Sequence, residues 1–227
     1  QSINGGNATP TDVSERTLHE VFLPPYELSV RKGGAGSAMM AHNDINGVPC
    51  HSNKWLMEDV LRKEYGFDGF IVSDWMDIER LHNRQFTATS RKEAFYQSIM
   101  AGMDMHMHGI YWNEEVVELV KEGRIPMSRI DASVRRILTA KFRLGLFENP
   151  YCDIEEGKKV RMCEEHRATA LEAARNSIVL VKNNGILPLK KDTKIALIGP
   201  MADSQYEALG EWFVRCHWQD VTNLKMA

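Results

Sequence analysis

The stretch "GFDGFIVSDW", residues 66–75, gives the strongest indication of how this chain folds. Residues 70–72 are three consecutive apolar residues, which is typical of a buried strand. Ser73, the carboxylate of Asp74 and the indole of Trp75 follow directly. The strand therefore leads out of the core to an acid beside an aromatic ring. Taken alone, Asp74 is equally compatible with a helix N-cap or a solvated loop acid.

The same apolar signal recurs on both sides of this stretch. Residues 37–44, "SAMMAHND", and 103–107, "MDMHM", are also expected to contain strands. The three strands start near residues 38, 70 and 103, so their spacings are 32 and 33 residues. This is the length of a βα unit of roughly 30 residues. The pattern predicts an α/β fold with a parallel sheet, in either a barrel or an open sheet.

Helices are expected between and after these strands because apolar residues recur there at helical spacing. Ser90 with Glu93 and Ser128 with Asp131 have the spacing of capping boxes. The pair Pro24-Pro25 is expected to interrupt the first helix. The expected helices cover residues 14–32, 52–66, 90–102, 114–123 and 128–144.

A change in composition marks the second part of the chain. Residues 147–160, "FENPYCDIEEGKKV", are polar and irregular, as an inter-domain linker would be. A helix near 164–176 and strands at 178–183 and 194–200 then restart the alternation of helix and strand. We interpret this part as the start of a second α/β domain that the chain enters but does not complete.

Composition excludes several classes of function. Apolar residues make up 43% of the 227 residues, and the net charge is 28 − 31 = −3, which does not favour a nucleic-acid partner. Four scattered cysteines form no CxxC pair, so a zinc knuckle or a dense disulfide framework is not indicated. No apolar run approaches the roughly 20 residues of a membrane span.

The two ends of the sequence lack the usual features of chain termini. Residues 1–12, "QSINGGNATPTD", contain no initiator Met and no signal peptide, and the last seven residues, "VTNLKMA", complete no element. We therefore interpret both ends as cuts through a longer protein.

Candidate site residues are expected at the carboxyl ends of the strands, where parallel sheets place their functional groups. Asp74 lies at such an end. Trp75 alone is more typical of a core residue, and the alternative is an exposed flat apolar surface that suits the C–H face of a sugar. His106 and His108 share one face of the third strand, which raises the hypothesis of a metal site, but no third ligand is evident. The chain has no GxSxG motif of a serine hydrolase.

Five segments together resemble glycoside hydrolase family 3, especially its bacterial-type β-glucosidases. The longest is "AHNDINGVPCHSNKWLMEDVLRKEYGFDGFIVSDW", residues 41–75. "AGMDMHM" and "IDASVRRILTAKFRLGLFENPY" resemble a later strand and the closing helix of the family's first domain. "ALEAARNSIVLVKNNGILPLKK" and "KIALIGPMADSQYEALGEW" resemble the opening of its second domain.

The resemblance implies a fold and a domain division. It implies part of a (β/α)8 TIM-like barrel over residues 1–147, a linker over 148–165, and the beginning of an α/β-sandwich domain over 166–227. It also implies that the family's acid/base Glu lies beyond residue 227. No cofactor and no metal are expected.

The resemblance also implies residue roles. Asp74 matches the family's catalytic nucleophile, and Trp75 matches the aromatic residue that flanks the sugar. His42 falls where relatives usually carry Tyr or Phe, and we expect it to line the same substrate-binding pocket. The segment "NATPTDVSE", residues 7–15, has no His after Asp12. This favours a glucosidase or xylosidase over the family's hexosaminidases.

The predicted function is that of a fragment of a retaining exo-acting β-glucosidase with Asp74 as nucleophile. A β-xylosidase of the same family and an inactive or merely sugar-binding homologue are the alternatives. The expected partner is a small β-glucoside or oligosaccharide. By resemblance alone, we expect a periplasmic or secreted protein.

Overall fold

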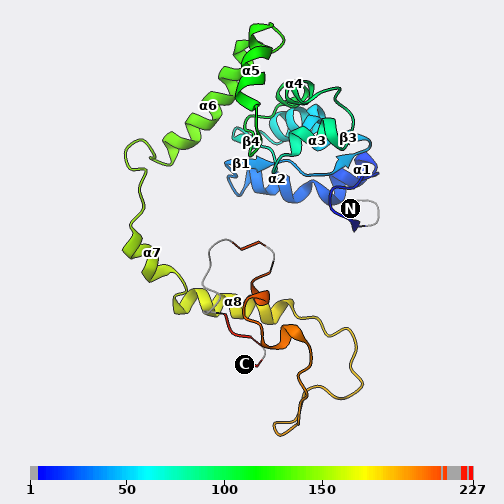
Figure 1. The fold of residues 1–227 in the computed structure, drawn as a ribbon, viewed down its shortest axis with the longest axis vertical. Helices are drawn as coiled ribbons and strands as arrows, with labels where there is room; N and C mark the ends of the chain where they lie inside the picture. Colours follow the sequence, from blue (N-terminus) through cyan, green and yellow to red (C-terminus); the bar gives the residue numbers. More distant parts are fainter. Residues whose placement is uncertain (1–4, 211, 214–220, 224, 227) are drawn as a thin grey trace. The chain divides into compact units, whose positions relative to one another are not determined.

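A computed structural model describes residues 5–210, 212–213, 221–223 and 225–226 of the chain (Figure 1). Cys216 lies outside the described residues, as do parts of both expected domains, residues 1–147 and 166–227. The chain divides into two compact units, Gln1–Asp153 and Ile154–Ala227. Within the described residues, no helix combines the length and the apolar character needed to cross a bilayer.

Two parallel strands lie side by side in the first unit (Figure 1). Strand β1 (Ser37–Met39) pairs with β4 (Phe70–Val72), and Ala38 lies opposite Ile71. The expected third strand is reduced to a single parallel bridge between Val72 and Met105. The expected α/β class is therefore confirmed, with the three segments in the parallel order that the spacing predicted.

Strand β4 forms because its residues fit a buried site between two neighbours. Ile71 is fully buried, and its carbonyl oxygen accepts hydrogen bonds from the backbone N–H groups of Asp104 and Met105, each at 3.0 Å. Gly69 admits β1 closely, since a Cβ at this position would lie 2.3 Å from the carbonyl oxygen of Gly36. Replacing the glycine would push the two strands apart.

The structure contains all five helical segments expected in the first unit, but it divides the first of them. The expected helix over 14–32 is divided into α1 (Glu15–Thr17), the π-helical turn η2 (Leu18–Phe22) and α2 (Pro24–Arg31). The other expected helices are found as η4 (Trp55–Glu64), α4 (Arg91–Ala101), α5 (Trp112–Lys121) and α6 (Met127–Arg143).

The two predicted capping boxes have different outcomes. Ser90 caps α4, and its hydroxyl accepts a hydrogen bond from Glu93 N at 3.1 Å. The prediction for Ser128 is wrong, because Pro126 is the N-cap of α6 and makes no side-chain cap. Pro126 holds an extended backbone and the helix begins directly after it, so Ser128 already lies inside the first turn.

A small hairpin and two short helices were not predicted. Strands β2 (Asp44–Ile45) and β3 (Val48–Pro49) pair across an Asn46-Gly47 turn in which both residues have positive φ, as a type I′ turn requires. The Asn46 side chain also accepts from Val13 N and donates to Val13 O, both at 2.8 Å. The 3-10 helix η3 (Cys50–Ser52) follows the hairpin, and α3 (Asp77–Asn83) follows β4.

The buried carboxylate of Asp104 joins three elements of this unit. Its Oδ2 accepts from Ile71 N in β4 at 3.0 Å and from Arg62 Nη2 in η4 at 2.6 Å. Its Oδ1 accepts from Ser133 Oγ and Arg136 Nη1 in α6, each at 2.8 Å. Asp104 thus attaches both helices to the strand that carries the candidate site residues.

The second unit contains helices and turns. Helix α8 (Glu164–Ser177) confirms the expected helix, whereas α7 (Ile154–Val160) lies in the segment predicted to be irregular. The strands predicted at 178–183 and 194–200 are wrong for this structure, since both segments are exposed and unpaired. A strand requires a hydrogen-bonded neighbour, and the described residues supply none to either segment. The last described elements are η5 (Pro200–Asp203) and η6 (Glu207–Leu209).

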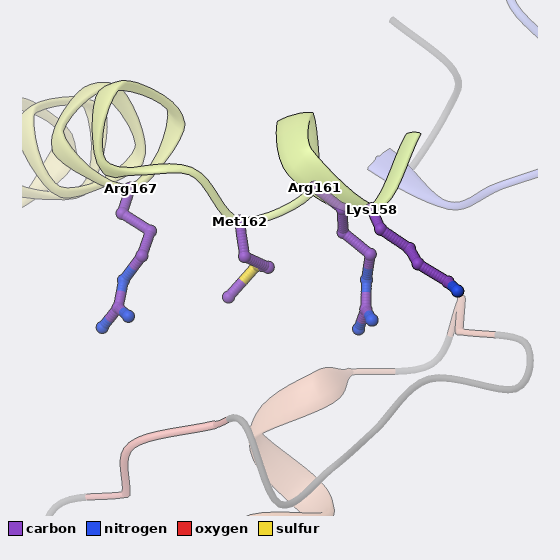
Figure 2. Close-up of a pocket in the computed structure, with 4 residues that line it drawn as sticks. All are labelled: Lys158, Arg161, Met162 and Arg167. Atoms are coloured by element: carbon purple, nitrogen blue, oxygen red, sulfur yellow. The ribbon is translucent and has the colours of Figure 1, made fainter. Parts of the chain in front are cut away.

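A basic cavity of about 380 Å³ lies where α7 leads into α8. It is lined by Lys158 of α7, by Arg161 and Met162 of the turn that follows, and by Arg167 of α8, and Figure 2 shows their side chains extending toward the same side. This cavity contains none of the predicted site residues.

Candidate active site

Three chain segments bring polar side chains to one edge of the first unit. His42 follows β1, Asp74 follows β4, and His108 follows the bridge at Met105. The segments run parallel, so their carboxyl ends meet at the same edge. The structure thus brings together two of the predicted site residues, Asp74 and His42, in direct contact.

Asp74 is held by hydrogen bonds at its backbone N–H and at Oδ1 and by a close contact at Oδ2. Oδ1 accepts from Trp75 N at 2.6 Å, and Oδ2 lies 3.0 Å from Nε2 of His42. The backbone N–H of Asp74 donates to Nε2 of His51 at 3.1 Å. The side chain is about one-fifth exposed, so the carboxylate is both fixed in orientation and open to solvent.

His51 is a site residue that the sequence reasoning missed. Its ring is buried, and burial lowers the pKa of His51 from 6.5 to about 4. At neutral pH the ring is therefore uncharged and Nε2 can accept the N–H of Asp74. A single histidine inside "VPCHSN" gives no sequence signal that distinguishes this role.

Asp77 and Arg80 lie at Nδ1 of His42, the ring nitrogen that does not contact Asp74. The Asp77 carboxylate is 1% exposed, and its Oδ2 contacts Nδ1 of His42. Arg80 Nη1 lies 2.8 Å from Asp77 Oδ1 and 3.3 Å from His42 Nδ1. Burial raises the pKa of the Asp77 carboxyl, while the hydrogen bond and charge of His42 and the charge of Arg80 oppose that rise. The only sequence signal for this pair is its i,i+3 spacing on a helix.

Ser73 connects the strand end of Asp74 to the neighbouring segment. Its hydroxyl donates to the carbonyl oxygen of Asp74 at 3.0 Å and accepts from Met107 N at 2.9 Å. Its own N–H donates to Met105 O at 2.9 Å. These bonds keep the Asp74 backbone in register with the segment that leads to His108.

Trp75 presents an exposed aromatic surface next to Asp74. The residue is 54% exposed, and its indole stacks on the ring of His108 with centroids 3.8 Å apart and planes 12° apart. Met76 adopts a left-handed conformation and donates its N–H to His108 O at 3.1 Å. The turn fixes the stack, and one face of the indole remains available to a ligand.

The two histidines of the metal hypothesis have different partners. His106 Nε2 lies 3.1 Å from Glu79 Oε2, and its ring stacks on Trp112, whereas His108 stacks on Trp75. Among the described residues, no cluster of three possible metal ligands includes either of them. Both therefore act as packing and stacking residues in this fold.

One group in the described part of the chain has ligand atoms close enough for a metal ion, namely His42, Asp74 and Asp77. The positive charge of Arg80 already lies against two members of this group, 2.8 Å from Asp77 Oδ1 and 3.3 Å from His42 Nδ1. A guanidinium at this distance repels a divalent cation, so the residues do not fit a metal site.

Comparison with known proteins identifies the family. Residues 1–140 match the family described as "Glycosyl hydrolase family 3 N terminal domain". The chain belongs to this family, as the resemblance of residues 41–75 predicted.

The relatives that match are glycosidases. A β-xylosidase of Formosa agariphila is 42% identical over 93% of this chain, and a periplasmic β-glucosidase of Salmonella typhimurium is 38% identical over 93%. The crystal structure of a Listeria innocua β-glucosidase in complex with glucose is 36% identical, with a TM-score of 0.86 over 99% of this chain. The chain spans 30%, 28% and 31% of the lengths of these three proteins.

Proposed function

We propose that this chain supplies the catalytic nucleophile, Asp74, of a retaining exo-acting β-glycosidase that removes terminal β-linked glucose. The observation that carries the proposal is the placement of Asp74. Its carboxylate is accessible at the carboxyl edge of the parallel strands. Hydrogen bonds at Oδ1 and at the backbone N–H, together with the contact between Oδ2 and His42, fix its orientation. Membership of glycosyl hydrolase family 3 and similarity to β-glucosidases support it.

The proposed reaction proceeds in two steps. One Asp74 oxygen attacks the anomeric carbon, the bond from that carbon to the aglycone oxygen breaks, and a second carboxyl group protonates the leaving oxygen. Water then releases the sugar from the covalent intermediate and restores the Asp74 carboxylate. Asp77 is unsuited to protonate the leaving oxygen, because it is 1% exposed and paired with His42 and Arg80. The family resemblance assigns that role to a Glu outside these 227 residues.

Trp75 and His42 are proposed as substrate-binding residues. The free face of the Trp75 indole offers apolar contact to the C–H face of a sugar ring bound over Asp74. His42 lies against the attacking carboxylate and lines a cavity of about 290 Å³ with Asp44 and Arg80. We propose that both residues contact the sugar because both lie next to Asp74.

The proposed architecture is part of a (β/α)8 barrel over residues 1–147, a linker over 148–165, and the start of an α/β-sandwich domain over 166–227. Within the described residues, β1 pairs with β4 alone and leaves its other edge open. An apolar cavity of about 510 Å³ adjoins it, lined by residues that include Phe22, Met39 and Ile45. Further barrel strands would cover this surface, so we expect the isolated chain to be poorly soluble and inactive.

A β-xylosidase is the second candidate, because the relative with 42% identity is a β-xylosidase. The two activities differ by the hydroxymethyl group that glucose carries and xylose lacks. Turnover of 4-nitrophenyl β-D-glucoside and β-D-xyloside by the same preparation separates them. A periplasmic or secreted location is proposed from the periplasmic relative alone.

The nucleophile assignment is tested by trapping. The full-length protein is incubated with a 2-fluoro β-glucoside bearing a good leaving group, digested, and analysed by mass spectrometry. We expect one fluoroglycosyl group on the peptide that contains Asp74, and at least a thousand-fold loss of turnover in Asp74→Gly. Asp131→Asn, an exposed acid on α6, is the matched control and is expected to keep full activity. Label on another residue, or ordinary turnover by Asp74→Gly, would refute the assignment.

The proposal also distinguishes a catalytic protein from a non-catalytic homologue. A homologue that only binds sugar would retain glucose without forming the labelled peptide. Equal binding of glucose to the wild-type protein and to Asp74→Gly, with no turnover by either, would therefore support the non-catalytic alternative.

A further inference from the structure

We propose that His42, oriented by Asp77 and Arg80, is a further catalytic residue that donates a hydrogen bond to Asp74 and speeds release of the sugar from it. This inference rests on the proposed function of Asp74 as nucleophile. It assigns a chemical task to a residue that the sequence places only in the substrate pocket, and it adds Asp77 and Arg80 as positioning residues.

The geometry around the His42 ring carries the proposal. Its Nε2 lies 3.0 Å from Asp74 Oδ2, and its Nδ1 contacts Asp77 Oδ2. An ionised carboxylate only accepts hydrogen bonds, so a hydrogen bond between Asp74 and His42 requires a hydrogen on Nε2. His42 is then the donor and Asp74 the acceptor.

Asp77 and Arg80 hold the His42 ring in place. Arg80 Nη1 lies 2.8 Å from Asp77 Oδ1 and 3.3 Å from His42 Nδ1, and Oδ2 of the same carboxylate contacts His42 Nδ1. Asp77 is 1% exposed and cannot turn away into water, so the ring that it holds keeps Nε2 within 3.0 Å of Asp74 Oδ2.

The charged groups near His42 come from several elements. Asp74 follows β4, Asp77 and Arg80 belong to α3, and His51 belongs to η3. His51 is uncharged at neutral pH because burial lowers its pKa to about 4, so it adds no positive charge beside the ring. Asp44 and Arg84 line the same cavity as His42 and add one charge of each sign.

The hydrogen bond from His42 has different strengths in the two steps of the reaction. Hydrogen bonds to an ionised carboxylate are roughly twice as strong as bonds between neutral groups. When Asp74 forms the ester to the anomeric carbon, its negative charge disappears and the bond from His42 weakens. When water attacks that carbon, the ester bond breaks, its electron pair returns to Asp74, and the bond strengthens again. His42 therefore stabilises the departing carboxylate and accelerates the second step, without transferring its own proton.

The first step does not gain from this bond. A hydrogen bond to the free carboxylate lowers its nucleophilicity, so loss of the donor leaves formation of the ester unchanged or slightly faster. A role in folding alone would weaken both steps. The ratio of the rates of ester hydrolysis and ester formation therefore distinguishes a catalytic role of His42 from a structural one.

The experiment measures the two steps separately in the full-length protein. The variants are His42→Phe, which removes the donor, His42→Gln, whose amide keeps an N–H donor, and Asp77→Asn. His166→Gln on α8 is the control, because this histidine is exposed and outside the first unit. The substrate is an aryl β-glucoside with a good leaving group, for which kcat/KM reports ester formation and kcat reports its hydrolysis. Reactivation of the 2-fluoroglucosyl form measures hydrolysis directly.

We expect His42→Phe to lower kcat and the reactivation rate by about ten- to a hundred-fold while kcat/KM changes less than about three-fold. His42→Gln and Asp77→Asn are expected to fall between this variant and the wild type. The control is expected to match the wild type. A proportional fall in kcat and kcat/KM for His42→Phe, or unchanged reactivation, overturns the inference.

A spectroscopic measurement on the unmutated protein covers the case in which a variant fails to fold. In protein labelled with ¹⁵N at histidine, we expect Nε2 of His42, assigned through His42→Gln or through its contact to Asp74, to carry a hydrogen. An Nε2 without a hydrogen overturns the inference. If the trapping reagent labels Asp74 but His42→Phe has the kinetics of the wild type, this inference fails and the proposed function stands. If Asp74→Gly retains turnover, the proposed function itself fails.

Discussion

The two units of the chain respond differently to the same kind of sequence signal. In the first unit, the apolar residues 70–72 form a strand between two neighbours, and Ile71 is fully buried. In the second unit, the apolar residues 178–181 form no strand, and Val181 is 91% exposed. Both segments have the composition of a buried strand. The difference shows that an apolar segment becomes a strand only where another segment offers it backbone hydrogen bonds and a surface to cover.

The largest expected difference between the units lies in the exchange of their backbone hydrogens. Amides of residues 70–73 are expected to exchange at least a thousand-fold more slowly than those of residues 178–183, because only the former are buried and hydrogen-bonded. Hydrogen exchange followed by mass spectrometry measures both segments in one sample. Slow exchange at 178–183 in the full-length protein alone would show that a partner outside these 227 residues completes a strand there. Fast exchange at 70–73 would contradict the fold described for the first unit.

The next expected effect concerns the buried ion pairs of Asp104. Asp104→Asn leaves the guanidinium groups of Arg62 and Arg136 without a carboxylate in a buried site, so we expect the first unit to lose about 3–5 kcal/mol of local stability. Local unfolding free energies from exchange of the amides in β4 and α6 provide the measurement. Glu155→Gln removes an exposed partner of Lys158 in the second unit, and we expect no measurable change from it. Equal losses of stability from the two substitutions would show that the ion pairs of Asp104 stabilise the chain no more than the exposed pair of Glu155 and Lys158 does.

A smaller, pH-dependent effect is expected from His51. Its pKa is lowered to about 4 in the folded chain, whereas the unfolded chain binds the proton near pH 6.5. Because the unfolded state binds more protons between these values, stability falls as the pH falls from 6.5 toward 4, by about 2 kcal/mol at pH 5. The local stability around Asp74, measured by exchange at pH 7.5 and pH 5, tests this in the wild type and in His51→Gln.

The His51→Gln variant serves as the reference in that measurement. Glutamine keeps an oxygen that can accept the N–H of Asp74 but does not titrate, so its stability is expected to depend less on pH by about the same 2 kcal/mol. An identical pH dependence in both proteins would show that His51 does not remain neutral at the strand end. The second unit, whose described part contains only the exposed His166, is expected to show no comparable effect.

Sequence reasoning predicted those parts of the fold that depend on nearby residues. The helix that Ser90 caps, the strand at 70–72 and the turn from β4 to Asp74 depend on local signals that were correctly interpreted. Ser128 was assigned wrongly because Pro126 two residues earlier already decides where α6 begins. The predicted strands at 178–183 and 194–200 depend on pairing partners, which local apolar content does not reveal.

The residues of the candidate site also differ in whether the local sequence predicts them. Asp74 and Trp75 could be predicted, because a carboxylate at a strand end beside an indole is visible in ten consecutive residues. The contacts of His42 with Asp74 and Asp77 could not, since they join residues 32 and 35 positions apart through the parallel pairing of β1 and β4. His51 was missed for the same reason, and its neutrality depends on burial that no local pattern specifies.

The Asn46-Gly47 turn exposes the chain to a slow covalent change. In such a dipeptide the unhindered glycine nitrogen can attack the side-chain carbonyl of asparagine and expel ammonia, and water then opens the resulting succinimide to aspartate or isoaspartate. Here the amide is bound to both backbone groups of Val13, which holds it away from that nitrogen while the hairpin is intact. After deamidation the side chain has no N–H group to donate to Val13 O. The loop that begins four residues earlier at His42 then loses one of the hydrogen bonds that hold it. Storage of the unfolded protein would therefore damage the site chemically before refolding begins.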